Sequence, residues 1–236
     1  MNPSSGVLKP EEETALLRST ENVQRAAVRH LSTHNGEASV VAFVQSLQQG
    51  VDRVVGAAVD GGAHIDCKAG CSHCCSARVE AIAPEIFQIA RELEQRAAEE
   101  LTETVDRLQA HIAASDKENT AWSHRKCCPF LTKNLCSIYK VRPAACRKAH
   151  SVDVSKCEAH APAIPQNLEI VLNAEALLRG TSGAYRQRGF DASGHELVRA
   201  VLVALLDPSA QARWYRGEQV FELTAPEPPK HSDDVG

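Results

Sequence analysis

Apolar residues recur at every third or fourth position along most of this chain, a spacing typical of one face of an α-helix. Pro10 is followed by three glutamates. This favours a helix start, because proline fits the first turn and carboxylates interact well with a helix N-terminus. The pattern predicts that this helix ends near Thr33. A second helix is predicted over residues 40–58, with Gly61 and Gly62 ending it.

The helical pattern continues on both sides of an irregular middle. Pro84 opens a third helical region, whose apolar stripe fits either one long helix or two. The pattern returns at Pro165, and we expect Gly180 to end that helix. Two shorter segments follow, at 196–206 and 208–215. Because the alternation typical of strands is almost absent, the pattern predicts an all-α fold.

Pattern and composition together divide the chain into five parts. We expect a flexible lead at 1–9, N-terminal helices at 10–62, a cysteine-rich region at 63–164, C-terminal helices at 165–223 and a disordered tail at 224–236. The tail contains three prolines and several charges, a composition typical of disorder. The second half of the cysteine-rich region lacks periodicity. So long an irregular stretch is unusual in a compact domain unless a metal centre organises it.

The overall composition narrows the class of protein. The 236 residues are 43% hydrophobic and 24% charged, an ordinary balance for a soluble globular chain. The longest apolar run, 201–206, is far shorter than the roughly 20 residues of a membrane span, so we expect no transmembrane helix. The N-terminus has no charged segment followed by an apolar one, which predicts no secretory signal and a cytoplasmic location. The net charge of −4 does not favour a nucleic-acid partner, and we expect none.

All nine cysteines lie within one part of the chain, between Cys67 and Cys157. Thiols used as small core fillers would be scattered, so the clustering indicates chemistry. Closely spaced thiolates suit zinc or an iron–sulfur cluster. Disulfides are disfavoured, because the chain is large, is expected in the cytoplasm and has an odd number of cysteines. Eight thiols could serve two four-sulfur sites or one polynuclear cluster. The adjacent Cys74 and Cys75 either face different metals or include one that bridges.

A basic segment overlaps the cysteines. Residues 121–150 contain seven basic and no acidic residues: Arg125, Lys126, Lys133, Lys140, Arg142, Arg147 and Lys148. Cationic neighbours would stabilise thiolates, so these residues are candidates for charge compensation at a metal site. Two other interpretations stay open, a docking patch for an acidic protein partner and a solvated face without a role. Five histidines lie in or near the same region: His64, His73, His124, His150 and His160. With so many thiols available, we expect each histidine to be a neighbour of the metal rather than a ligand.

Ordered motifs around the cysteines carry a family resemblance. They are Cys67…Cys71…Cys74-Cys75, Cys128-Pro129-Phe130-Leu131, Cys136-Ser137-Ile138-Tyr139 and Arg142-Pro143-x-x-Cys146-Arg147. Over about residues 64–160 the chain resembles the YkgJ-like cysteine-cluster (CxxCxxCC) family of zinc- or iron-chelating proteins, although its first gap is three residues rather than two. The resemblance implies metal ligands at Cys67, Cys71, Cys74, Cys75, Cys128, Cys136, Cys146 and Cys157, with Cys127 as an extra cysteine.

The side chains within these motifs suggest supporting roles. Phe130 and Tyr139 could cover the cluster from water or simply pack the irregular loop. Arg142 and Arg147 could hydrogen-bond carboxylates or lie over ligand sulfurs. Pro143 would fix the turn that brings the following cysteine back to the site.

The sequence therefore predicts helices packed around an irregular cysteine-rich metal-binding loop core. The favoured function is that of a cytoplasmic metal-binding protein whose thiolates chelate iron, as an iron–sulfur cluster, or zinc. Flagellin lysine N-methylases share the cluster domain, so the resemblance also permits a cluster-dependent protein-modifying enzyme. A third interpretation is a zinc-organised adaptor that docks a protein or, against the overall charge, a nucleic acid through residues 121–150. Neither a glycine-rich phosphate loop after a strand nor a G-x-S-x-G motif occurs, so the usual nucleotide sites are not supported.

Overall fold

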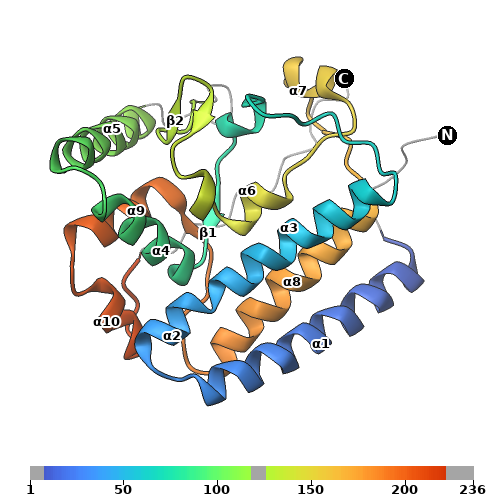
Figure 1. Cartoon of the computed structure of the whole chain (residues 1–236), viewed down its shortest axis with the longest axis horizontal. Coiled ribbons are helices and arrows are strands. Elements are labelled where there is room, and N and C mark those ends of the chain that lie inside the picture. The colour runs from blue at the N-terminus through green and yellow to red at the C-terminus, as the bar shows by residue number, and fades with distance from the viewer. Residues whose placement is uncertain (1–7, 118–125, 222–236) are drawn as a thin grey trace, which may run out of the picture.

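Three long helices lie side by side along one side of the molecule (Figure 1). The computed structural model describes residues 8–117 and 126–221. In it, α8 (Leu168–Gln187) packs between α1 (Pro10–Thr33) and α3 (Val44–Asp60). The short α2 (Glu37–Ala42) connects the first two of these helices along the chain, α1 and α3. We call α1, α3 and α8 the three-helix layer.

A second group of helices packs beside this layer. It contains α4 (Ala83–Glu94), α5 (Ala98–Lys117), α9 (Leu197–Leu206) and α10 (Ala210–Tyr215). Helix α9 packs against both α4 and α5. A two-residue antiparallel pair, β1 (Glu80–Ala81) with β4 (His195–Glu196), joins the start of this group to the segment before α9.

The cysteine-rich segments lie at one end of the molecule and contain only short elements. They are η1 (His73–Ser76), β2 (Leu131–Thr132), β3 (Leu135–Cys136), η2 (Tyr139–Val141), α6 (Ala144–Lys148) and α7 (Val154–Glu158). Strands β2 and β3 pair with each other in an antiparallel hairpin. The mostly helical fold with an irregular cysteine-rich part confirms the predicted fold class.

The hydrophobic core joins the two helical groups through a set of aromatic contacts. Trp214 is fully buried, with its ring centroid 5.7 Å from that of Phe87, 5.0 Å from that of Phe190 and 6.0 Å from that of Tyr185. The Tyr185 hydroxyl donates a hydrogen bond of 2.8 Å to the carbonyl of Val40, which satisfies its buried polar end. The few aromatic residues of the chain are thus concentrated where the N- and C-terminal helices meet.

Two helix predictions need correction. The predicted second helix is divided into α2 and α3 at Phe43. The region after Pro84 forms two helices, which is one of the two alternatives that its apolar stripe allowed. Gly180 does not end a helix, because α8 continues through it to Gln187. A Cβ at Gly180 would lie 2.7 Å from the carbonyl oxygen of Thr20, so glycine is needed for the close approach of α1 and α8.

The bounds of α1 and α9 match the predicted ones closely, and α10 falls within its predicted range. The predicted tail at 224–236 and most of the predicted lead at 1–9 lie outside the described residues. Within the described ranges, every helix is either too short or too polar to span a bilayer.

Candidate metal centre

The first cysteine loop is shaped by two tight backbone turns. The Cys71 N–H donates to the carbonyl of Lys68 at 3.0 Å, and the Cys75 N–H donates to the carbonyl of Ser72 at 2.9 Å. Gly70 has a φ of +84°, a left-handed conformation that glycine adopts without steric cost. These turns place four thiols within a nine-residue segment that has no core of its own.

Asp66 fastens this loop to the segment that carries Cys157. Its N–H donates to the carbonyl of Ser151 at 2.9 Å, and its carboxylate accepts from the Val154 N–H, at the start of α7, at 2.8 Å. The sequence offered no partner for Asp66, because these contacts join residues more than eighty positions apart. These two hydrogen bonds of Asp66 hold α7 against η1, so Cys67 and Cys157 belong to the same part of the site.

The second cysteine group is joined to the first by a backbone hydrogen bond. The Cys128 N–H donates to the Cys75 carbonyl at 2.7 Å. The β2–β3 hairpin that follows turns through Lys133 and Asn134, which have φ values of 50° and 62°. Two left-handed residues in a two-residue loop form a type I′ turn, whose twist matches the paired strands. The hairpin returns the chain so that Cys136, on β3, comes back toward Cys128.

A buried carboxylate holds the helix that carries Cys146. Glu85 lies in the first turn of α4 and accepts hydrogen bonds from the Ala144 N–H at 2.7 Å and the Ile82 N–H at 3.3 Å. Burial raises the pKa of Glu85, although both hydrogen bonds act in the opposite direction. Glu85 therefore caps two helices at once. Sequence analysis missed it, because a glutamate after Pro84 looks like an ordinary first-turn acid.

Three of the seven basic residues attach the cysteine region to the three-helix layer. Arg147 pairs with Asp52 of α3, and Arg142 reaches the same carboxylate at 3.8 Å. Lys148 pairs with Glu175 of α8 at 2.9 Å. Their positive charge is thus compensated at least partly by carboxylates from neighbouring helices. Arg142 also acts on the thiols, since its charge favours the ionised forms of Cys74 and Cys136.

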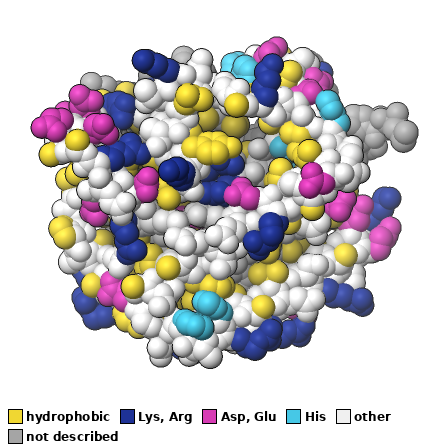
Figure 2. All heavy atoms as spheres, viewed as in Figure 1, with side chains coloured by type: hydrophobic (Ala, Val, Ile, Leu, Met, Phe, Trp, Pro, Cys, Tyr) yellow, Lys and Arg dark blue, Asp and Glu magenta, His cyan; other side chains and the backbone are white. Residues whose placement is uncertain are grey.

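The two aromatic residues of the motifs have different environments. Phe130 is fully buried and belongs to the hydrophobic core. The side chain of Tyr139 is 63% exposed, and the guanidinium carbon of Arg142 lies 3.7 Å from its ring centroid in a cation–π contact. Figure 2 shows hydrophobic and basic side chains next to one another on this face, in the region of β2 and α6.

Burial controls the protonation of the thiols near the core. Burial, with a smaller contribution from neighbouring thiols, raises the pKa of Cys128 to about 11 and that of Cys146 to about 12. Burial also raises the pKa of Cys136, against the effect of a hydrogen bond from the Ile138 N–H. The expected stabilisation of thiolates by cations is therefore outweighed at these positions. A metal that binds here must displace protons from the thiols.

Cys74 and Cys75 shift each other's pKa in opposite directions. The Cys74 thiol donates a hydrogen bond to the Cys75 sulfur, which raises the pKa of Cys74 and lowers that of Cys75. In the first loop, burial raises the pKa of Cys67, and the thiols of Cys71, Cys74 and Cys157 add to this effect. Mutual influence of this kind arises only between groups that lie close together.

All nine cysteines are free thiols. Among residues 8–117 and 126–221, no three histidine, cysteine, aspartate or glutamate side chains are already arranged to hold a metal ion. The segments that carry the predicted ligands are nevertheless connected to one another. Metal binding would therefore require the thiols to move closer together.

The described histidines differ in their partners. His150 is buried, donates from Nδ1 to the carbonyl of Lys148 at 2.8 Å and accepts at Nε2 from the Asn167 N–H at 2.9 Å. Both ring nitrogens are occupied, so His150 acts as a connector between the cysteine region and α8. His64 contacts the Asp66 carboxylate at 2.7 Å, and His124 lies outside the described residues.

A comparison with protein families identifies this part of the chain. Residues 66–166 match the model of the CxxCxxCC family, described as "Putative zinc- or iron-chelating domain". Residues 66–166 are thus similar to the CxxCxxCC family, and we call them the CxxCxxCC domain below. The match confirms the resemblance noted in the sequence, and it covers all nine cysteines. No curated protein and no solved structure matches the chain.

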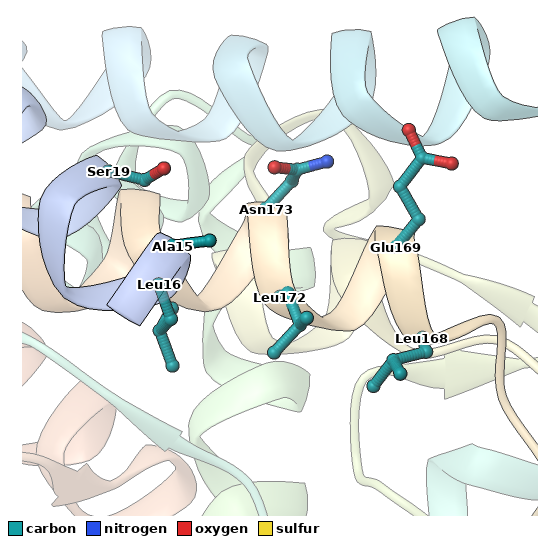
Figure 3. A pocket seen from close by; sticks show the side chains of 7 residues that line it. All are labelled: Ala15, Leu16, Ser19, Leu168, Glu169, Leu172 and Asn173. Carbon is teal, nitrogen blue, oxygen red and sulfur yellow. The ribbon is translucent and has the colours of Figure 1, made fainter. Parts of the chain in front are cut away.

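Two surface cavities lie outside the CxxCxxCC domain's thiols. One, of about 280 Å³, lies between α1 and α8, where Figure 3 shows Leu16 of α1 close to Leu172 of α8. The other, of about 460 Å³, lies between α1, α3 and α8 and extends past Arg53 and Asn173. Neither cavity is lined by a cysteine, so neither places a small-molecule substrate beside the thiols.

Proposed function

We propose that the CxxCxxCC domain chelates zinc or iron through eight thiolates and that Cys127 is not a ligand. The ligands are Cys67, Cys71, Cys74, Cys75, Cys128, Cys136, Cys146 and Cys157. The main support is the hydrogen bond between the Cys128 N–H and the Cys75 carbonyl, because it joins two cysteine groups that are more than fifty residues apart.

The chemistry of the donor set fits this proposal. Thiolates are the preferred ligands of structural zinc and of iron–sulfur clusters, and both are normally bound by sets of four. Bound zinc would cross-link the short segments, while an iron–sulfur cluster would add one-electron chemistry. The chain's contribution is to hold the thiols near one another, to exclude water with Phe130 and the core, and to supply positive charge from Arg142.

The proposal also implies a reducing environment, because partly exposed free thiols oxidise readily in an oxidising compartment. This agrees with the expected cytoplasmic location. A lysine N-methylase-like activity is not favoured by any contact or cavity of the described residues.

The decisive experiment is elemental analysis of protein purified without oxygen, together with its visible spectrum. A brown protein that absorbs near 400 nm contains an iron–sulfur cluster, and a colourless protein with stoichiometric zinc contains zinc. Protein that is free of both metals, and binds neither when reconstituted, would contradict the proposal. The Cys127→Ser variant is the matched control and should retain the wild-type metal content.

A docking role is a second candidate, favoured by exposed side chains next to the thiols. Leu135 and Tyr139 are 61% and 63% exposed, and Lys133 and Lys140 flank them. No acidic residue occurs between 126 and 150. We infer that this face can bind an acidic protein segment. Binding of a fluorescent glutamate- and leucine-containing peptide should weaken with salt and in the Lys133→Glu/Lys140→Glu variant; unchanged binding would exclude the role.

A further inference from the structure

We propose that the eight thiols form two separate four-thiol metal centres rather than one. The inner centre consists of Cys75, Cys128, Cys136 and Cys146. The outer centre consists of Cys67, Cys71, Cys74 and Cys157. This inference rests on the proposed chelation and adds to it the number of sites, the membership of each and a difference in how firmly they hold metal.

The inner group is connected through backbone contacts and the core. The Cys128 N–H donates a hydrogen bond to the Cys75 carbonyl, and the β2–β3 hairpin brings Cys136 back toward Cys128. The Ser137 N–H donates to the Phe130 carbonyl at 2.8 Å, which closes this arrangement. Both Cys128 and Cys136 pack against the hydrophobic core.

Cys146 completes the inner group from α6. The Glu85 cap fixes the first residue of this helix, and Arg147 fixes its last turn on α3. The Cys136 thiol raises the pKa of Cys128, both raise the pKa of Cys146, and all three act to raise the pKa of Cys75. These four thiols therefore lie near one another, in agreement with the backbone contacts.

The outer group is connected through a different set of contacts. The Asp66 carboxylate caps α7 and so ties the loop that starts at Cys67 to the helix that carries Cys157. His73, between Cys71 and Cys74, lies 4.0 Å from Glu158, the residue after Cys157. Three thiols raise the pKa of Cys67, those of Cys71, Cys74 and Cys157, and they are the other members of this group.

The boundary between the centres falls between two consecutive residues. Side chains of adjacent residues diverge from the backbone, so Cys74 and Cys75 do not readily bind one ion together. The hydrogen bond between their sulfurs links the two groups. The Cys74 thiol also raises the pKa of Cys136 and of Cys146. The centres are therefore neighbours. Loading both requires this hydrogen bond to break, with Cys74 turning toward Cys67.

The two centres differ in solvent access. Cys67 and Cys74 are exposed, whereas Cys71, Cys157 and all four inner thiols are partly buried. With two of its four thiols exposed, the outer centre should exchange metal with a chelator faster than the inner one.

The test is an anaerobic titration of the full-length reduced protein with Co²⁺ alone, followed by visible absorption, with thiol accessibility and circular dichroism measured on the same samples. The wild-type protein and the Cys127→Ser control should bind two equivalents. The Cys74→Ser variant should bind one and keep its fold, and Cys67→Ser and Cys157→Ser should behave like it. The Cys75→Ser variant should lose the slowly exchanging equivalent.

Loss of the inner site could unfold the domain, so the three outer variants decide the question. One retained equivalent with slow exchange in each of them supports two centres. A wild-type protein that binds a single equivalent, or outer variants that bind none while remaining folded, would overturn the division. Wild-type protein that binds no Co²⁺, zinc or iron at all would instead overturn the proposed chelation itself.

Discussion

In the three-helix layer, neighbouring helices touch along their length, whereas the segments of the CxxCxxCC domain meet at single hydrogen bonds between distant residues. Helix α1 approaches α8 closely enough that Gly180 admits no side chain. By contrast, η1, the hairpin, α6 and α7 are held by hydrogen bonds and ion pairs between distant residues, such as those of Asp66, Glu85 and Arg147. Burial stabilises the first region by many small contributions. In the second, one substitution can remove an important side-chain contact, and we expect metal to supply further stability.

Metal removal should separate the two regions most clearly. Structural zinc contributes on the order of 10–16 kcal/mol of apparent binding free energy in small domains, so a chelator or the Cys146→Ala substitution should disorder the cysteine segments. The three-helix layer should keep its helices. Amide hydrogen exchange on loaded and stripped protein checks this. Unchanged protection in the first cysteine loop would show that metal does not order it.

The Trp214→Ala substitution tests the opposite side of the comparison. Its ring is fully buried among three aromatic rings, and its indole N–H donates to the Asp191 carbonyl at 2.7 Å. Truncation of a buried tryptophan costs about 3–5 kcal/mol, so the free energy of unfolding in denaturant should fall by this amount. Metal stoichiometry should not change in the protein that remains folded. A parallel loss of metal would mean that the two regions are coupled more strongly than their contacts indicate.

Glu85 lies at the junction of the two regions, and its variants should give an intermediate effect. The Glu85→Ala substitution leaves two buried N–H groups without an acceptor, at about 1–3 kcal/mol each. It should lower both the unfolding free energy and the metal affinity. The Glu85→Gln variant keeps an acceptor for Ala144 and should recover much of both. If calorimetry gives the two variants the same unfolding free energy and metal affinity, Glu85 does not act as a hydrogen-bond acceptor for the two helices.

The smallest effect is expected at Asp52, which is half exposed where it pairs with Arg147 and Arg142. Surface ion pairs contribute at most about 1 kcal/mol, so Asp52→Asn should shift the thermal midpoint by only a few degrees. The remaining hydrogen bonds of Arg147, to the carbonyls of Arg142 at 2.9 Å and of Lys140, should hold the segment in place. A large loss of metal in this variant would assign these ion pairs a greater role than their exposure suggests.

Much of the helical part could be predicted because its signals are local. Pro10 and the glutamates after it mark the start of α1, and apolar spacing defines most of its length. Gly180 is the exception, because glycine serves equally to end a helix and to let two helices approach. The choice between these depends on α1, which is about 160 positions earlier in the chain.

The candidate ligands were also accessible to sequence reasoning, since few roles besides metal binding require cysteines that are clustered with ordered spacing. Their supports were not. Asp66 and Glu85 each contact backbone groups about sixty or more positions away, and such contacts leave no periodic pattern. The division of the thiols likewise depends on how η1 turns between Cys74 and Cys75, which spacing alone does not determine.

The position of the CxxCxxCC domain between α3 and α8 has a consequence for reloading. The second cavity is lined by residues from the end of α3, such as Ala57, and from the start of α8, such as Ile170, so the chain leaves and re-enters the layer at nearby points. The stripped cysteine segments would thus stay attached to packed helices, with the two ends of the domain already held near each other, so the entropy cost of closing this loop would already be met. Such a tether lets empty protein recapture metal repeatedly without passing through a fully unfolded chain.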